Sequence, residues 1–94
     1  MKELKDTIQL MESDNYKERF VAEYWQTKIR YEKLKAFNNK IEAAERTRTS
    51  YGECVKIDAP KHDCPMEMLQ EQQRKMGEYL HLLEVRAVIE GIYL

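Results

Sequence analysis

The C-terminal stretch of the chain reads Tyr79-Leu80-His81-Leu82-Leu83-Glu84-Val85-Arg86-Ala87-Val88-Ile89-Glu90-Gly91-Ile92-Tyr93-Leu94. Read as a helix, it carries apolar residues on nearly every side. A helix that is apolar on more than one face has to be covered on more than one side, and a chain of 94 residues cannot supply both covers. We therefore expect a homo-oligomer, in which another copy of the chain covers this helix.

The composition favours an all-α protein with one domain, residues 1–94. Charged residues make up 35% of the chain, glycine and proline occur only three times and twice, and long runs lack the alternation that is typical of strands. The net charge of -1 argues against duplex binding, which normally requires a basic excess. We expect no nucleic-acid polymer as a partner, and a nucleic-acid-binding regulator is the weakest of the functions considered.

The spacing of apolar residues divides the chain into four segments. Residues 1–13 predict a short helical arm that has to pack on something larger. Residues 14–46 and 64–94 predict two long helices, and residues 47–63 between them lack helical periodicity. The fold that follows is a long antiparallel helical hairpin with a short N-terminal helix.

Residues that begin helices are found before both long segments. Asp14 or Asn15 is suited to cap the first long helix, and Pro65 is suited to the first turn of the second. Because no stretch is apolar enough to span a membrane and the Met-Lys-Glu start lacks a signal region, we expect a cytoplasmic protein.

Metal binding and catalysis find little support in the sequence. Cys54, His62, Asp63 and Cys64 have metal-binding side chains, but they lack the spacing of zinc modules, so we expect reduced thiols and no metal. No nucleophile has a histidine at a catalytic spacing, and no glycine-rich phosphate loop is present. We expect a protein that is not an enzyme and that needs no cofactor.

A set of aromatic and arginine residues offers groups that can stack on a nucleotide base and contact its phosphates. Its members are Tyr16, Arg19, Phe20, Arg46, Arg48, Tyr51 and Arg86. The first three begin a long helix, where free backbone N–H groups favour an anion, although the aromatic pair can equally be part of the core. The members near the loop can form a lid over a ligand or a solvated surface.

Arg86 is the one cation inside the apolar C-terminal stretch. Its guanidinium group needs a partner there. The candidates are an ion pair with Glu90 or with Glu23, or an anion bound where two subunits meet.

The pattern of residues 16–92 resembles a family of small phage proteins. It is carried by Tyr16-x-x-Arg19-Phe20-x-x-Glu23-Tyr24-x-x-x-Lys28-x-x-Tyr31-x-x-Leu34-x-x-Phe37 and by Met68-Leu69-x-x-Gln72-x-x-x-Met76-x-x-Tyr79-Leu80-x-x-Leu83-x-x-Arg86. This spacing is similar to that of the anti-Thoeris (Tad-type) sponges, which are related to the anti-CBASS cyclic-nucleotide sponges.

The resemblance implies a phage protein that captures an immune signal of the infected bacterial host without degrading it. The signals would be glycocyclic ADP-ribose and, in some members, cyclic oligonucleotides, held in pockets between the subunits of a dimer or a hexamer. The alternative from the residues alone is a structural or adaptor protein that binds another protein through Trp25 and the apolar C-terminal face.

Overall fold

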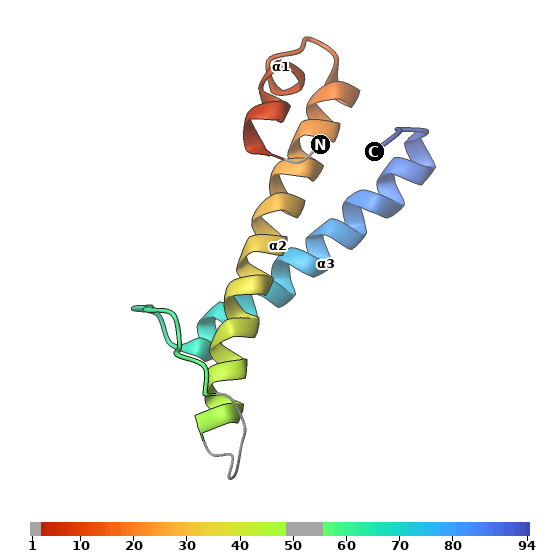
Figure 1. Ribbon diagram of the computed structural model, residues 1–94. Coiled ribbons are helices and arrows are strands. Elements are labelled where there is room, and N and C mark those ends of the chain that lie inside the picture. Colours follow the sequence, from red (N-terminus) through yellow and green to blue (C-terminus); the bar gives the residue numbers. More distant parts are fainter. Residues whose placement is uncertain (1–2, 49–55) are drawn as a thin grey trace.

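The structure is a computed structural model that describes residues 3–48 and 56–94. Four helical elements follow one another in these ranges, namely η1 (Leu4–Thr7), α1 (Ile8–Met11), α2 (Tyr16–Arg48) and α3 (Met66–Glu90), and the described residues contain no strand. Figure 1 shows α2 running along the whole molecule, with α3 returning beside it and the short N-terminal helices at its beginning. The all-α prediction is confirmed.

Helix α2 begins at Tyr16 because Asn15 caps it. The Asn15 side-chain oxygen accepts a hydrogen bond from the backbone N–H of Lys17 at 2.9 Å, which satisfies one of the free donors of the first turn. At the other end, the Thr47 hydroxyl donates to the Ala43 carbonyl at 2.8 Å within the last turn. The helix therefore begins two residues after the predicted start of the 14–46 segment and ends two residues beyond its predicted end.

Helix α3 is shorter than the predicted segment 64–94 at both ends. Pro65 has an extended backbone, with φ -58° and ψ 146°, so it stands just before the helix and not in its first turn. Gly91 ends the helix with φ 68°, a left-handed conformation that glycine adopts at little cost. The backbone N–H of Ile92 then donates to the Ala87 carbonyl at 2.8 Å, which closes the helix end.

The N-terminal arm packs on the first half of α2. It consists of a 3₁₀ turn and one α-helical turn rather than a continuous helix. Thr7 is fully buried, and its hydroxyl donates to the Leu4 carbonyl at 2.7 Å while accepting from the Gln26 amide at 3.0 Å. This buried polar contact fixes the arm to α2.

Helices α2 and α3 are antiparallel and bury a core at one end of the hairpin. The Tyr24 hydroxyl donates to Glu84 at 2.7 Å, whereas Asn38, further along α2, contacts Gln73, which lies earlier in α3. The core consists of Phe20, Tyr24, Leu80, Leu83 and Ala87. Trp25 is partly buried and meets the Tyr24 ring edge-on at 5.5 Å.

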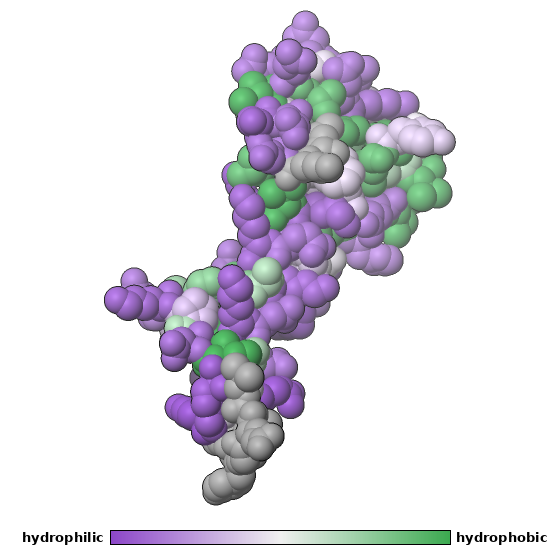
Figure 2. Space-filling model, in the orientation of Figure 1, coloured by the Kyte–Doolittle hydropathy of each residue, from purple (hydrophilic) through white to green (hydrophobic). Residues whose placement is uncertain are grey.

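The described residues leave a second apolar surface of α3 uncovered. We call it the α3 apolar face, and it consists of Leu82, Val85, Val88 and Ile89, with Tyr93 just beyond the helix; all are exposed. Figure 2 shows hydrophobic side chains gathered at the end of the molecule where α3 terminates. Among the described residues, no helix combines the length and the apolar character needed to cross a membrane.

Candidate functional site

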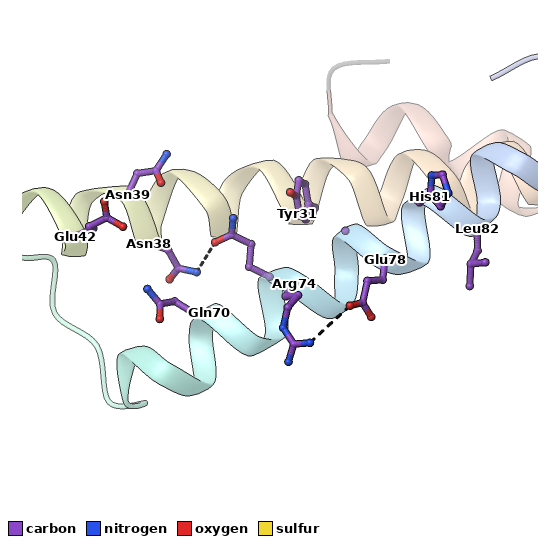
Figure 3. Close-up of a pocket in the computed structure, with 11 residues that line it drawn as sticks. Tyr31, Asn38, Asn39, Glu42, Gln70, Arg74, Glu78, His81 and Leu82 are labelled. Atoms are coloured by element: carbon purple, nitrogen blue, oxygen red, sulfur yellow. Dashed lines mark hydrogen bonds and ion pairs between the residues drawn. The ribbon is translucent and has the colours of Figure 1, made fainter.

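A groove of about 880 Å³ lies between the middle of α2 and the first half of α3. Its polar side chains comprise one cation, two carboxylates, four carboxamides, a tyrosine and a histidine, namely Arg74, Glu42, Glu78, Asn38, Asn39, Gln70, Gln73, Tyr31 and His81. Figure 3 shows Asn38 of α2 and Gln70 of α3 pointing toward one another, whereas Arg74 and Glu78 extend from α3 on the side away from α2. We call it the amide groove because four of its polar side chains carry carboxamide groups, which both donate and accept hydrogen bonds.

Asn38 is the buried centre of the amide groove, with 4% of its surface exposed. Its amide nitrogen donates to the Leu69 carbonyl at 3.1 Å and to the Gln73 side-chain oxygen at 2.9 Å. Both amide hydrogens are therefore used, whereas the buried Oδ1 has no hydrogen-bond partner among the described residues. An orphaned acceptor of this kind is uncommon in folded proteins and requires an explanation.

Tyr31 forms an aromatic wall of the groove and depends on a glycine opposite. Gly77 lies inside α3, where glycine costs about 1 kcal/mol relative to alanine. A Cβ at this position would stand 3.2 Å from Cε1 of Tyr31, closer than an ordinary contact. The missing side chain lets the Tyr31 ring lie directly against α3.

The ion pair that lines the groove is long and exposed to solvent. Arg74 and Glu78 form an ion pair at 3.7 Å, and both side chains are more than half exposed. An exposed pair at this distance contributes little to stability. The Arg74 guanidinium is therefore able to exchange Glu78 for an anionic ligand at small cost.

Three of the residues singled out from the sequence meet at the far end of the hairpin, beyond the groove. The Arg86 guanidinium lies over the Phe20 ring at 4.8 Å, and the Tyr16 hydroxyl donates to Glu90 at 3.1 Å. Arg86 pairs with Glu90 at 2.8 Å, which is one of the two ion pairs considered. The other candidate, Glu23, accepts a hydrogen bond from Tyr79 at 2.6 Å.

Arg86 lies closer to solvent in the single chain than its apolar neighbours suggested, since 55% of its side chain is exposed. The hydrogen bond to Glu90 raises the pKa of Tyr16, because ionising the hydroxyl would place two negative charges together. An anion at this place would have to compete with Glu90.

The remaining members of the predicted set lie elsewhere. Arg19 donates to the Ser13 carbonyl at 2.7 Å, so it stabilises the turn before α2. Arg46 and Arg48 pair with Glu42 and Glu45 at 3.0 and 2.6 Å near the end of α2. The seventh residue, Tyr51, lies outside the described residues.

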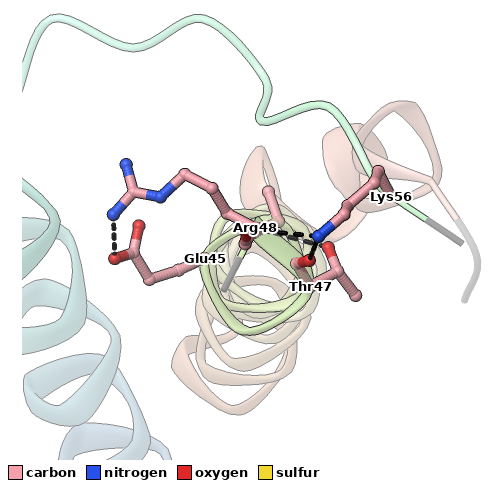
Figure 4. A network of polar contacts seen from close by, with 5 residues as sticks. Glu45, Thr47, Arg48 and Lys56 are labelled. Atoms are coloured by element: carbon pink, nitrogen blue, oxygen red, sulfur yellow. Dashed lines mark hydrogen bonds and ion pairs between the residues drawn. The ribbon is translucent and has the colours of Figure 1, made fainter. Parts of the chain in front are cut away.

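Lys56, at the beginning of the second described range, contacts the end of α2. Its ammonium group donates to the Thr47 carbonyl at 2.7 Å and to the Arg48 carbonyl at 3.2 Å, where the helix dipole favours a cation (Figure 4). A smaller cavity of about 540 Å³ adjoins this contact, and Arg48, Lys56 and His62 line part of it. The set predicted from the sequence is thus spread over three places, and its role in binding stays a prediction.

The cysteine and histidine cluster forms no recognisable metal site in the part of the chain that the structure describes. No three histidine, cysteine, aspartate or glutamate side chains gather within residues 3–48 and 56–94. His62 contacts the Cys64 carbonyl at 2.7 Å through Nδ1, and Cys64 is exposed as a free thiol. Cys54 lies outside these ranges.

Two polar residues on the apolar stripes of the sequence point to the amide groove. Asn38 stands between Leu34 and Ile41 on the apolar stripe of α2, and Gln73 stands between Leu69 and Met76 on that of α3. Polar residues at core positions of two paired helices indicate a polar contact between them.

The stability of the fold should depend on pH through Tyr24. Burial, and the hydrogen bond to Glu84, raise its pKa from 10.0 to about 12. Between these values the unfolded chain loses the proton that the folded chain keeps, so stability is full below pH 10 and falls as the pH rises. We expect a loss of about 1 kcal/mol by pH 12, because solvent screens part of the effect.

Denaturant titrations between pH 9 and 12 measure this loss. Tyr24→Phe should make the decline shallower without abolishing it, because the pKa values of Tyr16 and Tyr79 are also raised by their carboxylate partners. If the stability of the wild-type and Tyr24→Phe proteins fell equally with pH, the assignment of this loss to Tyr24 would be wrong.

Comparison with known proteins places the chain in a family. No curated protein and no solved structure matches it. A family model described as Sequestin matches residues 14–89, which include α2, nearly all of α3 and every residue of the amide groove. The chain therefore belongs to the Sequestin family.

Proposed function

We propose that the protein is a non-catalytic phage sponge that sequesters cyclic nucleotide immune signals in the cytoplasm of an infected bacterium. Glycocyclic ADP-ribose is the leading candidate, and cyclic oligonucleotides are further ones. Membership of the Sequestin family supports a sequestering role. The observation that carries the proposal is the amide groove between the two long helices.

The size and chemistry of the amide groove suit a nucleotide. Its volume of about 880 Å³ falls in the range of about 300–1,000 Å³ that is typical of small-molecule sites. Tyr31 offers an aromatic plane for a base, and the carboxamides offer groups for its edge. Arg74 offers a guanidinium for a phosphate.

Sequestration makes different demands from catalysis. It needs tight binding and slow release, which a preformed groove between two rigid helices supplies at a low cost in ordering. It needs no acid, base or metal at the ligand. We therefore assign the groove to holding the signal and not to changing it.

A second copy of the chain is the proposed cover of the α3 apolar face. Gln70, Arg74 and His81 of the groove share one side of α3 with Val85 and Ile89, since these positions follow one another at intervals of four or seven residues. A partner seated on the apolar face would therefore stand beside the groove. This arrangement accords with a ligand held where subunits of a dimer or hexamer meet.

Arg86 and Phe20 are assigned a secondary part in this proposal. They lie next to the α3 apolar face, and the guanidinium stacks on the ring. When subunits associate, the Arg86 side chain can contact a phosphate in exchange for Glu90. Tyr16, Arg19, Arg46, Arg48 and Tyr51 remain predicted ligand contacts on the sequence argument alone.

Calorimetric titration tests the function. Glycocyclic ADP-ribose, a cyclic dinucleotide and, as a control, linear ADP-ribose are each titrated into the protein. We expect binding of at least one cyclic ligand at a stoichiometry of one molecule or less per chain, and clearly weaker binding of the linear control. Absence of binding across the cyclic ligands would contradict the proposal.

An adaptor protein is the second candidate, and the exposed α3 apolar face favours it. Such a face can bind another protein as well as a second copy. Trp25 fits this candidate less well than the sequence suggested, because its ring packs partly against the core of its own chain. A chain that is monomeric and binds no nucleotide would support the adaptor.

A further inference from the structure

The orientation of the Asn38 amide is determined by its surroundings. The Leu69 carbonyl can only accept, so the Asn38 atom 3.1 Å from it has to be the nitrogen. The second amide hydrogen is directed to the Gln73 oxygen. Reversing the amide would set two oxygens against each other at Leu69, and the acceptor Oδ1 is therefore left facing a place where a donor is missing.

The unpaired Asn38 oxygen lowers the stability of the α2–α3 pair. A buried acceptor without a partner is destabilising, whereas an apolar side chain of similar volume would fill the same place without that loss. Asn38 stands between Ile41 and Leu34 on the apolar stripe, where leucine would suit the packing. Stability alone does not explain an asparagine here.

A second unfavourable feature lines the same groove. Gly77 lowers the helical propensity of α3 at its middle, and it permits the close approach of Tyr31. Two locally unfavourable residues, one on each helix, face one groove. Local features that oppose stability are expected where a site is built for binding.

We infer that Asn38 is the specificity-determining residue of the amide groove, and that its Oδ1 accepts a hydrogen bond from the exocyclic amino group of an adenine base. This inference rests on the proposed function and adds the part of the ligand that is recognised. The amino group of the base supplies the donor that Oδ1 lacks in the free protein. Because both amide hydrogens of Asn38 are engaged, the residue can only accept, so it pairs with the N6 amino group and does not also donate to N7.

This inference requires one exposed side chain to move aside for the ligand. Figure 3 shows Gln70 pointing toward Asn38 from α3, and Gln70 is exposed to solvent. An exposed glutamine changes rotamer at little cost, so the adenine edge takes its place when the ligand binds. The Asn38 hydrogen bonds to Leu69 and Gln73 stay intact and hold the amide in the orientation that accepts.

Two ligands and two proteins test the inference. The ligands are glycocyclic ADP-ribose and its counterpart with unsubstituted purine in place of adenine, which lacks only the amino group. The proteins are the wild-type chain and Asn38→Leu, each titrated calorimetrically with both ligands. Thermal unfolding of the two proteins without ligand shows whether Asn38 also supports the fold.

We expect the wild-type chain to bind the adenine ligand at least 10-fold more tightly than the purine ligand. Asn38→Leu should bind both ligands with equal, weak affinity, and its melting temperature should be equal to or higher than that of the wild type. Asn38→Ser, which removes the carboxamide without adding an apolar side chain, should also lose the discrimination between the ligands. It serves as the second variant if leucine disturbs the groove.

Equal binding of both ligands by the wild-type chain would overturn the inference and leave the proposed function standing. Full discrimination retained by Asn38→Leu or Asn38→Ser would overturn it as well. Absence of binding of either ligand to the wild-type chain, together with no binding of other cyclic nucleotides, would overturn the inference and the proposed function together.

Discussion

Replacing Leu83 by alanine is expected to lower the free energy of unfolding by about 3 kcal/mol. Leu83 is 2% exposed and packs in the core between α2 and α3. Removing its buried methyl groups loses their transfer free energy and leaves a cavity that two rigid helices fill only in part. Because a domain of this size is stable by about 5–10 kcal/mol, the loss is a large share of the total.

Urea denaturation of the wild-type and variant chains at equal protein concentration measures this loss. Met68→Ala is the matched control, because it removes a flexible apolar side chain of similar size that is 61% exposed near the start of α3. We expect this control to lose less than about 1 kcal/mol of its free energy of unfolding. If both variants lost the same stability, Leu83 would not be part of the core.

Replacing Ile89 by lysine is expected to weaken self-association at least about 100-fold, which corresponds to about 2.7 kcal/mol. Ile89 is 77% exposed in the single chain and lies on the α3 apolar face. If a second copy covers this face, the lysine would bury an unpaired charge there. The fold of each chain should be kept, because a cation near the C-terminal end of a helix is favourable.

Sedimentation equilibrium of both proteins from nanomolar to micromolar concentration measures this effect. Gln72→Lys introduces the same side chain on an exposed polar position of α3 and should leave the association unchanged. A wild-type chain that is already monomeric at micromolar concentration would remove the basis for assigning a second copy to the α3 apolar face.

The helices of this fold were predictable because local signals define them. The stripes of α2 and α3, the Asn15 cap and the apolar character of residues 79–94 all follow from spacing and composition. The predicted ends differ from the observed ones by two residues at three helix ends and by four at the C-terminal end of α3. Thr47 extends α2 through a hydrogen bond within its last turn, and Gly91 ends α3 by a backbone conformation that the sequence only permits.

The candidate site was less predictable than the fold. The sequence drew attention to arginine and aromatic residues, such as Arg86 and Phe20, which do meet in the structure. Asn38 and Gln73 on the two apolar stripes indicate a polar contact, but the sequence does not show that they meet, because this depends on how two helices that are distant along the chain face each other. Pairing of this kind depends on the relative register of α2 and α3, which periodicity alone does not determine.

The proposed function requires the chain to remove a nucleotide signal from solution without altering it. The most direct measurement mixes the protein in slight excess with glycocyclic ADP-ribose, passes the mixture through a membrane that retains the protein, and quantifies the nucleotide by mass spectrometry before and after heating the retained fraction. We predict an almost nucleotide-free filtrate and full recovery of unchanged glycocyclic ADP-ribose after heating. Free nucleotide in the first filtrate, or a chemically altered product after heating, would contradict the claim.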